Sequence, residues 1–208
     1  MAELATLAEV LPAPGTTSFT RQQSPLGLGH AVWCARELVG DEPFAVLLPD
    51  MLMMAKPGCL KQMVDAWRGL GEGASVIAVE EVPADQTHLY GVVGVGKEKG
   101  KAFEISGMVE KPPSGKAPSN LIISGRYILQ PDIFPILEKQ ERGAGGEIQL
   151  TDAMIAHAKR APFFGYKFDG RTYDSGSKLG FLIANVAYAL DRKDIAPGFR
   201  EELKKLLD

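Results

Sequence analysis

The sequence predicts an α/β fold, a doubly wound and mainly parallel sheet with a small antiparallel excursion. Compact apolar runs, typical of strands buried on both faces, alternate along the chain with amphipathic stretches of helical spacing. Between residues 90 and 111 the pattern changes to short Val/Gly strands around a KEKGK turn, which indicates antiparallel pairing. The 208 residues are 45% hydrophobic and 24% charged, the balance of an ordered chain of about one domain.

The first half of the chain contains the elements that open the sheet. Helical spacing of leucines predicts a helix over 2–11, and the Gly-rich stretch before His30 predicts a turn that leads into a further helix. In order, we expect a helix over 2–11, a short strand over 18–23, a helix over 30–39, a buried strand over 44–50, a helix over 60–70 and a buried strand over 74–82.

The second half repeats this alternation after the antiparallel strands. Thr151 and Asp152 can cap a helix, and the apolar run over 179–190 predicts a buried one. In order, we expect a strand over 121–129, a helix from 131 with the charged end EKQER, a helix from 151 to 160, a strand over 163–170, the buried helix and an amphipathic helix over 199–207.

Composition excludes several classes of protein. A formal charge of -3 argues against nucleic-acid binding, so any phosphate chemistry must use a few placed cations or a metal. The apolar run over 179–190 is too short for a bilayer, and Glu3 and Glu9 stand where a signal peptide would be basic and then apolar. Cys34 and Cys59 have no zinc or disulfide spacing. A cytoplasmic protein without membrane or nucleic-acid partners is expected.

Three places along the chain could carry chemistry. No GxxxxGK[ST] motif occurs, and GLGHAV lacks the third glycine of a dinucleotide fingerprint, so the residues alone favour a tight turn at Gly27 and Gly29 over a ligand loop. Asp50 ends a buried strand, where ligands bind in open α/β sheets, and Asp174 lies in the turn YDSGSK. Together they could hold Mg²⁺, although Asp174 alone could be a turn or cap residue.

The third place is VEKP. Glu110 can accept from hydroxyl groups and Lys111 can neutralise a phosphate, but neighbours on a strand point to opposite sides. Both reach one ligand only if the chain bends there, which Pro112 makes plausible, and the alternative is a solvated surface pair. Lys178 could reach an anion at the start of the following helix.

The order of these motifs resembles a known family. LGLGHAV, LLPD, YGVV, VEKP, SNLIISGRYIL, GGEIQLTDA and YDSGSKLG follow one another as in bacterial UTP–glucose-1-phosphate uridylyltransferases, which are sugar nucleotidyltransferases. The resemblance runs from about Phe19 to the C-terminus. The combination of GGEIQLTDA with YDSGSKLG is specific to this branch. The resemblance implies a Rossmann-like sheet and a homo-oligomer. The implied reaction forms UDP-glucose and pyrophosphate from UTP and glucose 1-phosphate, with Mg²⁺ as cofactor.

The resemblance also implies residue roles. Asp50 and Asp174 would bind magnesium, and Lys111 would hold the sugar phosphate. These three residues would form the catalytic group. Residues 147–152 would shape the sugar side of the pocket. The remaining substrate contacts would be Gly29 and His30 at the uridine, Gly91, Glu110 and Asn120 at the sugar, and Lys178 at the phosphates.

One departure from the family is large. Its arginine- and lysine-bearing nucleotide loop, of the type GxGTRxxPxTK, does not occur in the chain, which starts before the family's third strand. We therefore expect one partial domain over 1–208, with an N-terminal helix and loop over 1–18 and a C-terminal helix over 191–208, and poor catalysis by the chain alone.

The missing strands should leave apolar faces partly uncovered at 44–48 and 76–79, and we expect either self-association that fills the gap or a partly disordered N-terminus before Phe19. Two alternatives remain open. One is a non-catalytic protein that binds sugar phosphate or associates with complete subunits. The other is a nucleotidyltransferase for another sugar 1-phosphate.

Overall fold

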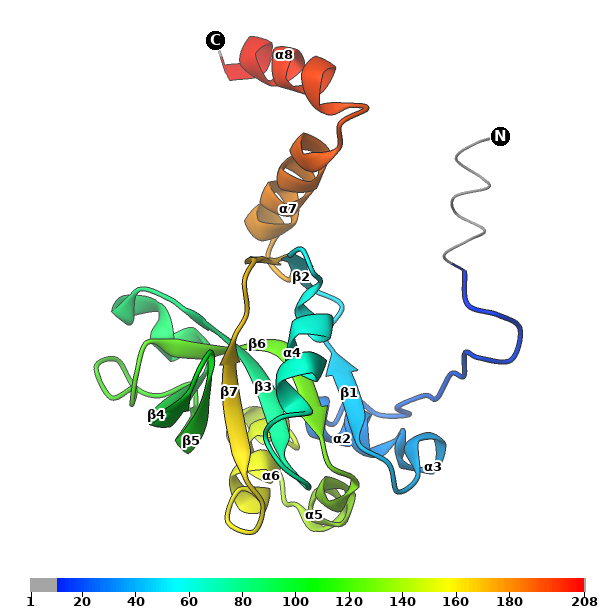
Figure 1. The fold of residues 1–208 in the computed structure, drawn as a ribbon, viewed down its shortest axis with the longest axis vertical. Coiled ribbons are helices and arrows are strands. Elements are labelled where there is room, and N and C mark those ends of the chain that lie inside the picture. The colour runs from blue at the N-terminus through cyan, green and yellow to red at the C-terminus, as the bar shows by residue number, and fades with distance from the viewer. Residues whose placement is uncertain (1–10, 208) are drawn as a thin grey trace.

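The computed structural model describes residues 11–207, so nearly all of the helix expected over 2–11 lies outside the described residues. Its centre is a six-stranded sheet in the order β1-β6-β3-β7-β5-β4, beside a two-stranded sheet of β2 and β8 (Figure 1). The strands are β1 (Phe44–Leu47), β2 (Met51–Met54), β3 (Ser75–Glu81), β4 (Gly91–Lys99), β5 (Ala102–Glu110), β6 (Leu121–Leu129), β7 (Phe163–Lys167) and β8 (Arg171–Asp174).

Helices connect most of these strands. The α-helices are α2 (Leu28–Trp33), α3 (Arg36–Val39), α4 (Cys59–Trp67), α5 (Phe134–Lys139), α6 (Leu150–His157), α7 (Lys178–Asp191) and α8 (Ala196–Leu207). Three short 3₁₀ helices, η1 (Ala84–Leu89), η2 (Pro131–Ile133) and η3 (Ala144–Gly146), complete the connections. No helix within 11–207 is long and apolar enough to cross a membrane.

Both faces of the central sheet are covered, which confirms the α/β class. The side chains of β3 point alternately into two hydrophobic cores, because successive side chains of a strand point to opposite faces. Val76 and Ala78 belong to the core under α4, whereas Ile77 and Val79 belong to the larger core beneath α5 and α6. The antiparallel excursion is also confirmed, since β4 and β5 form a hairpin that turns at Gly100.

Strand directions within the sheet are mixed. β6 runs antiparallel to both β1 and β3, so those two strands share a direction with β7, and β3–β7 is the one parallel ladder among the described strands. Because β6 lies beside β3, the expectation that 76–79 is uncovered is wrong: Val76 and Ile77 are fully buried. The expectation holds for β1, an edge strand whose Leu47 is 48% exposed.

Other expectations also differ from the structure. Residues 18–23 form no strand because no neighbouring strand pairs with them, and the helix expected over 30–39 is divided into α2 and α3 around Ala35. Residues 51–54 form β2, a strand that the sequence does not predict. The helix expected to start at a Thr151–Asp152 cap starts at Leu150, with Gln149 as its N-cap residue.

Helix α7 is not the buried helix that its apolar sequence predicts. It extends away from the central sheet together with α8 (Figure 1), and within the described chain it packs mainly on β8 and α8. Ala184 is its one buried residue, while Leu179 and Leu182 are 69% and 61% exposed. Self-association, which could cover such a surface, stays a prediction.

Candidate functional site

Five of the nine individually named catalytic, metal-binding and substrate-binding residues surround one cavity. It has a volume of about 330 Å³ and is lined by residues from the β1–β2 connection, β4, β5, β6, α6 and β8. This size lies within the range of small-molecule sites. Its lining includes Asp50, Gly91, Glu110, Lys111 and Asp174.

The two aspartates approach each other across the small sheet. Asp50 directly precedes β2, and Asp174 ends β8 opposite Met51 in the β2–β8 register. Ser175 ties the two segments together, because its backbone N–H and its hydroxyl both donate to the Asp50 carbonyl at 2.8 Å. A Cβ added at Gly176 would lie 3.0 Å from Asp174 Oδ1 and 3.3 Å from Asp50 Oδ2, so both carboxylates face the same point.

This pair can hold a hard divalent cation. Mg²⁺ is typically bound through one or two protein carboxylates, with water or substrate phosphates supplying the other oxygens. Asp50 and Asp174 match that donor set. Residues 11–207 contain no group of three or more His, Cys, Asp or Glu side chains arranged around a common point. The arrangement therefore fits a cation shared with a phosphorylated substrate better than a closed structural metal site.

Arg126 on β6 braces the backbone on both sides of Asp50. Its guanidinium donates to the Leu48 carbonyl at 2.8 Å, to the Met51 carbonyl at 2.6 Å and to the Gly125 carbonyl at 2.9 Å. These bonds come from two separate nitrogen atoms of one rigid plane, Nη1 and Nη2, whereas an ammonium group has a single nitrogen. The turn that carries Asp50 is thereby fastened to the central sheet.

Glu110 and Lys111 reach the same cavity because the chain bends between them. Lys111 has φ 44°, and it is the one non-glycine residue within 11–207 whose φ is positive. This left-handed conformation ends β5 and breaks the alternation that would send neighbouring side chains to opposite faces. The Lys111 backbone N–H donates to the Tyr90 carbonyl at 3.0 Å, which holds the bend against the start of β4.

The carboxylate of Glu110 lies above Gly91 and meets α6. Gly91 is the register partner of Glu110 in the β4–β5 ladder. A Cβ on Gly91 would lie 3.1 Å from Glu110 Oε2 and 3.0 Å from Ile123 Cδ1. The Thr151 hydroxyl donates to Glu110 Oε2 at 2.7 Å.

A buried phenol forms part of the cavity wall. Tyr127 on β6 is 5% exposed, and burial, together with the nearby carboxylates of Glu110 and Asp50, raises the pKa of its hydroxyl. The phenol therefore stays protonated at neutral pH and can donate a hydrogen bond into the cavity. Sequence reasoning missed Tyr127 because an aromatic residue within a buried strand is ordinarily a packing residue.

Four of the expected site residues lie outside the cavity lining. Gly29 packs against the backbone of Ile148, to whose carbonyl its N–H donates at 2.8 Å. His30 Nδ1 lies 2.8 Å from the Gln22 amide nitrogen. The other two, Asn120 and Lys178, are exposed on the loop before β6 and at the start of α7.

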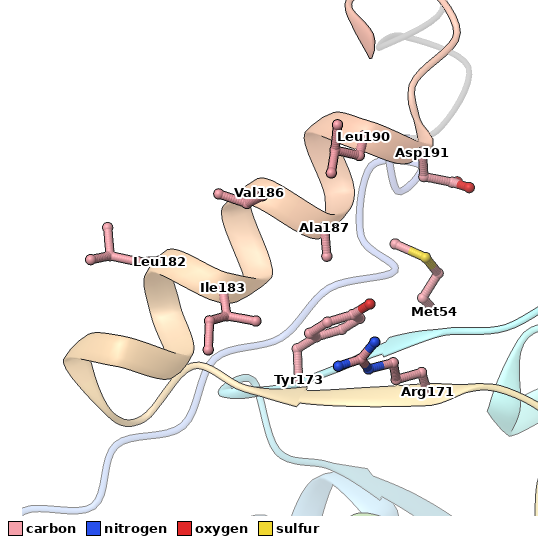
Figure 2. A pocket seen from close by; sticks show the side chains of 9 residues that line it. All are labelled: Met54, Arg171, Tyr173, Leu182, Ile183, Val186, Ala187, Leu190 and Asp191. Atoms are coloured by element: carbon pink, nitrogen blue, oxygen red, sulfur yellow. The ribbon is translucent and has the colours of Figure 1, made fainter. Parts of the chain in front are cut away.

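A larger cavity under α7 has a different chemical character. It measures about 550 Å³, and Figure 2 shows Ile183 and Ala187 of α7 facing Tyr173 and Met54 on the small sheet. Its charged groups are already engaged, because Arg171 stacks on Tyr173 and Asp191 lies 3.6 Å from Lys56. None of the expected site residues lines it. The smaller, polar cavity is therefore the candidate site.

Comparisons with known proteins identify similar sequences and structures. A family model described as nucleotidyl transferase matches residues 7–189. The UTP–glucose-1-phosphate uridylyltransferase of Bacillus subtilis (strain 168) is 46% identical over 177 residues, which are 85% of this chain and 60% of that protein. The chain therefore spans about 60% of the length of this curated relative.

Solved structures share the fold. A UDP-glucose pyrophosphorylase complexed with UDP-glucose is 43% identical with a TM-score of 0.80, over 84% of this chain and 66% of that chain. A UTP-bound UGPase from Acinetobacter baumannii is 36% identical with a TM-score of 0.82, over 99% of this chain and 72% of that chain. The second match covers nearly the whole of this chain, so α7 and α8 lie within the aligned part.

Proposed function

The chain belongs to the nucleotidyl transferase family, and we propose that it acts as a UTP–glucose-1-phosphate uridylyltransferase. The reaction would form UDP-glucose and pyrophosphate from UTP and glucose 1-phosphate. The observation that carries the proposal is the convergence of Asp50, Asp174, Glu110 and Lys111 on one cavity. The relatives named for this activity support the choice of substrates.

The proposed chemistry needs positioning and charge more than covalent catalysis. A phosphate oxygen of glucose 1-phosphate attacks the α-phosphorus of UTP in line, which forms one P–O bond and breaks the bond to the leaving pyrophosphate. No covalent enzyme intermediate is required. Because both reactants are anions, most of the catalytic effect comes from holding them together and neutralising their charge.

Side chains of the cavity match these tasks. Lys111 presents its ammonium group to the phosphate of glucose 1-phosphate, and Glu110 accepts hydrogen bonds from the sugar hydroxyls. Gly91, which has no Cβ, leaves room beside β4 for the carboxylate of Glu110. Asp50 and Asp174 hold a divalent cation, which we propose to be Mg²⁺. When bound, this cation supplies positive charge to the phosphate oxygens.

The nucleotide side of the proposed site is less complete on this chain. The sequence contains no GxGTRxxPxTK motif, which would supply backbone donors and cationic side chains to the triphosphate. Removing a single transition-state donor costs about 10²–10³ in rate in a well-studied enzyme. We therefore expect the chain by itself to bind glucose 1-phosphate but to turn over slowly.

Calorimetric binding of glucose 1-phosphate in the presence of MgCl₂ tests the proposal. Lys111→Ala should abolish measurable binding, whereas Lys116→Ala, a matched change of an exposed lysine in the same loop, should leave it unchanged. A UDP-glucose formation assay with UTP added completes the test. A folded chain that binds no glucose 1-phosphate and forms no UDP-glucose would refute the function.

A further inference from the structure

We infer that Thr151 is a positioning residue that determines how the site recognises sugar hydroxyls, by fixing the carboxylate of Glu110. The inference rests on the proposed function, because it concerns the side chain assigned there to the sugar. It does not require Thr151 to touch the substrate. Its basis is the hydrogen bond from Thr151 Oγ1 to Glu110 Oε2, 2.7 Å long.

The direction of the Glu110 side chain is set by its neighbours on the sheet. Gly91 lies opposite Glu110 in the β4–β5 register, and without a Cβ it leaves open the path that the carboxylate takes. An alanine there would bring its Cβ within 3.1 Å of Oε2 and 3.5 Å of the Thr151 hydroxyl oxygen. The carboxylate is thus held between a glycine on one strand and a hydroxyl on a helix.

The donor itself is held in place by packing. Thr151 is the second residue of α6 and is 8% exposed. Its helix is anchored by Leu150, Ala153 and Met154, which are 2%, 0% and 0% exposed within the larger core. Since a threonine side chain has few rotamers in a helix, the hydroxyl occupies a defined position.

This arrangement leaves one carboxylate oxygen for a ligand. Oε2 accepts from Thr151, and among the described residues no donor reaches Oε1 of Glu110. A carboxylate fixed in this way presents an acceptor in one direction, whereas a freely rotating one adapts to hydroxyls in several places. Thr151 therefore makes the site selective for a particular hydroxyl of the sugar.

Two variants of Thr151 separate this role from packing. Thr151→Val keeps the shape and removes the donor, and Thr151→Ser keeps the donor and removes a methyl group. The probes are glucose 1-phosphate and its monodeoxy analogues, each measured by calorimetry with MgCl₂. The parent chain should prefer glucose 1-phosphate over at least one analogue by about tenfold, which is typical of losing one hydrogen bond to a charged group.

Thr151→Val should reduce this preference to less than about threefold, and Thr151→Ser should retain it. In a Glu110→Ala background, which leaves the Thr151 hydroxyl no side-chain acceptor at that position, Thr151→Val should have little additional effect, because the two residues act as one unit. Equal discrimination by the parent and Thr151→Val, or additive effects in the double variant, would overturn the inference and leave the proposed function intact. A parent chain that binds no sugar phosphate would contradict the proposed function itself. Should Thr151→Val not fold, loss of the preference in Thr151→Ser would overturn the inference.

Discussion

Replacing Arg126 with methionine tests whether the turn that carries Asp50 is held by the sheet. The guanidinium donates to the carbonyls of Leu48, Met51 and Gly125, at 2.8, 2.6 and 2.9 Å. Methionine has a similar length and can occupy the same half-buried space, but it has no donor. The change therefore removes three hydrogen bonds and leaves three carbonyl groups to find other partners.

The structure sets the expected size of the effect. A hydrogen bond from a charged group contributes about 1.5–3 kcal/mol, and a half-buried site favours the lower end of that range. The three bonds share one guanidinium and are not independent, so we expect a total loss of about 3 kcal/mol in the free energy of unfolding. For a chain of this length such a loss lowers Tm by about 9 °C.

Urea unfolding and thermal melts of the parent and variants give the measurement. Arg171→Met is the matched control, because Arg171 stacks on the ring of Tyr173 and donates to none of these carbonyls. It should lose less than about 1 kcal/mol, the usual limit for an exposed stacking contact. Arg126→Lys should fall between the two, since a single ammonium nitrogen cannot occupy the positions of both Nη1 and Nη2. Equal stabilities of the two methionine variants would refute the bracing role.

Two further predictions concern single residues. Lys111→Ala and Lys111→Gly should both lose glucose 1-phosphate binding. The glycine variant should be more stable than the alanine variant by up to about 1 kcal/mol, because φ 44° favours glycine. Equal urea midpoints of the two variants would contradict this. Burial lowers the pKa of His157, with Asp132 opposing and Arg160 reinforcing the shift. The unfolded state thus binds more protons below about pH 6.5, and stability should fall as the pH decreases through that value. His157→Gln should flatten the dependence of Tm between pH 7.5 and 5.5, and His88→Gln, at an exposed site, should not.

Local patterns in the sequence predict most of the strands. The β4–β5 hairpin and strand β6 follow directly from turn residues and apolar runs. The direction of β6 could not be predicted, because an apolar run buried on both faces has the same composition in either direction. Its place in the sheet could not be predicted either, and that place decides which strand is exposed: β6 lies between β1 and β3, so β3 is covered and β1 remains at the edge.

The candidate site could be predicted only in part from the sequence. The residue types of Asp50 and Asp174 fit a cation site, but Asp174 alone also fits a turn or cap, and Glu110 with Lys111 alone fits a solvated surface pair. Their assignment to one site rests on the order of the motifs, which resembles that of a known family. The mechanism that brings Glu110 and Lys111 together, a left-handed backbone at a lysine, has no sequence signal beyond the adjacent prolines. Thr151 was interpreted as a helix cap, because a threonine before an apolar run is typical of one, and its hydroxyl instead reaches a residue 41 positions away. The apolar spacing of α7 indicated burial but could not identify which surface would cover it.

The charge of the cavity leads to a last prediction, about the proposed cation. Its lining contains three carboxylates, on Asp50, Glu110 and Asp174, and one lysine, Lys111. Such a site repels a sugar phosphate unless a cation offsets the charge. Adding EDTA should therefore weaken the binding of glucose 1-phosphate to the parent chain by at least about tenfold, or 1.4 kcal/mol.

Asp174→Asn should bind more tightly than the parent in EDTA, because one negative charge is gone, and more weakly in MgCl₂, because a cation ligand is gone. Asparagine keeps the oxygen that accepts from the Gly176 N–H, so the turn should persist. If EDTA left the affinity of the parent unchanged, or if Asp174→Asn changed affinity in the same direction under both conditions, the two aspartates would not hold a cation that the phosphate needs.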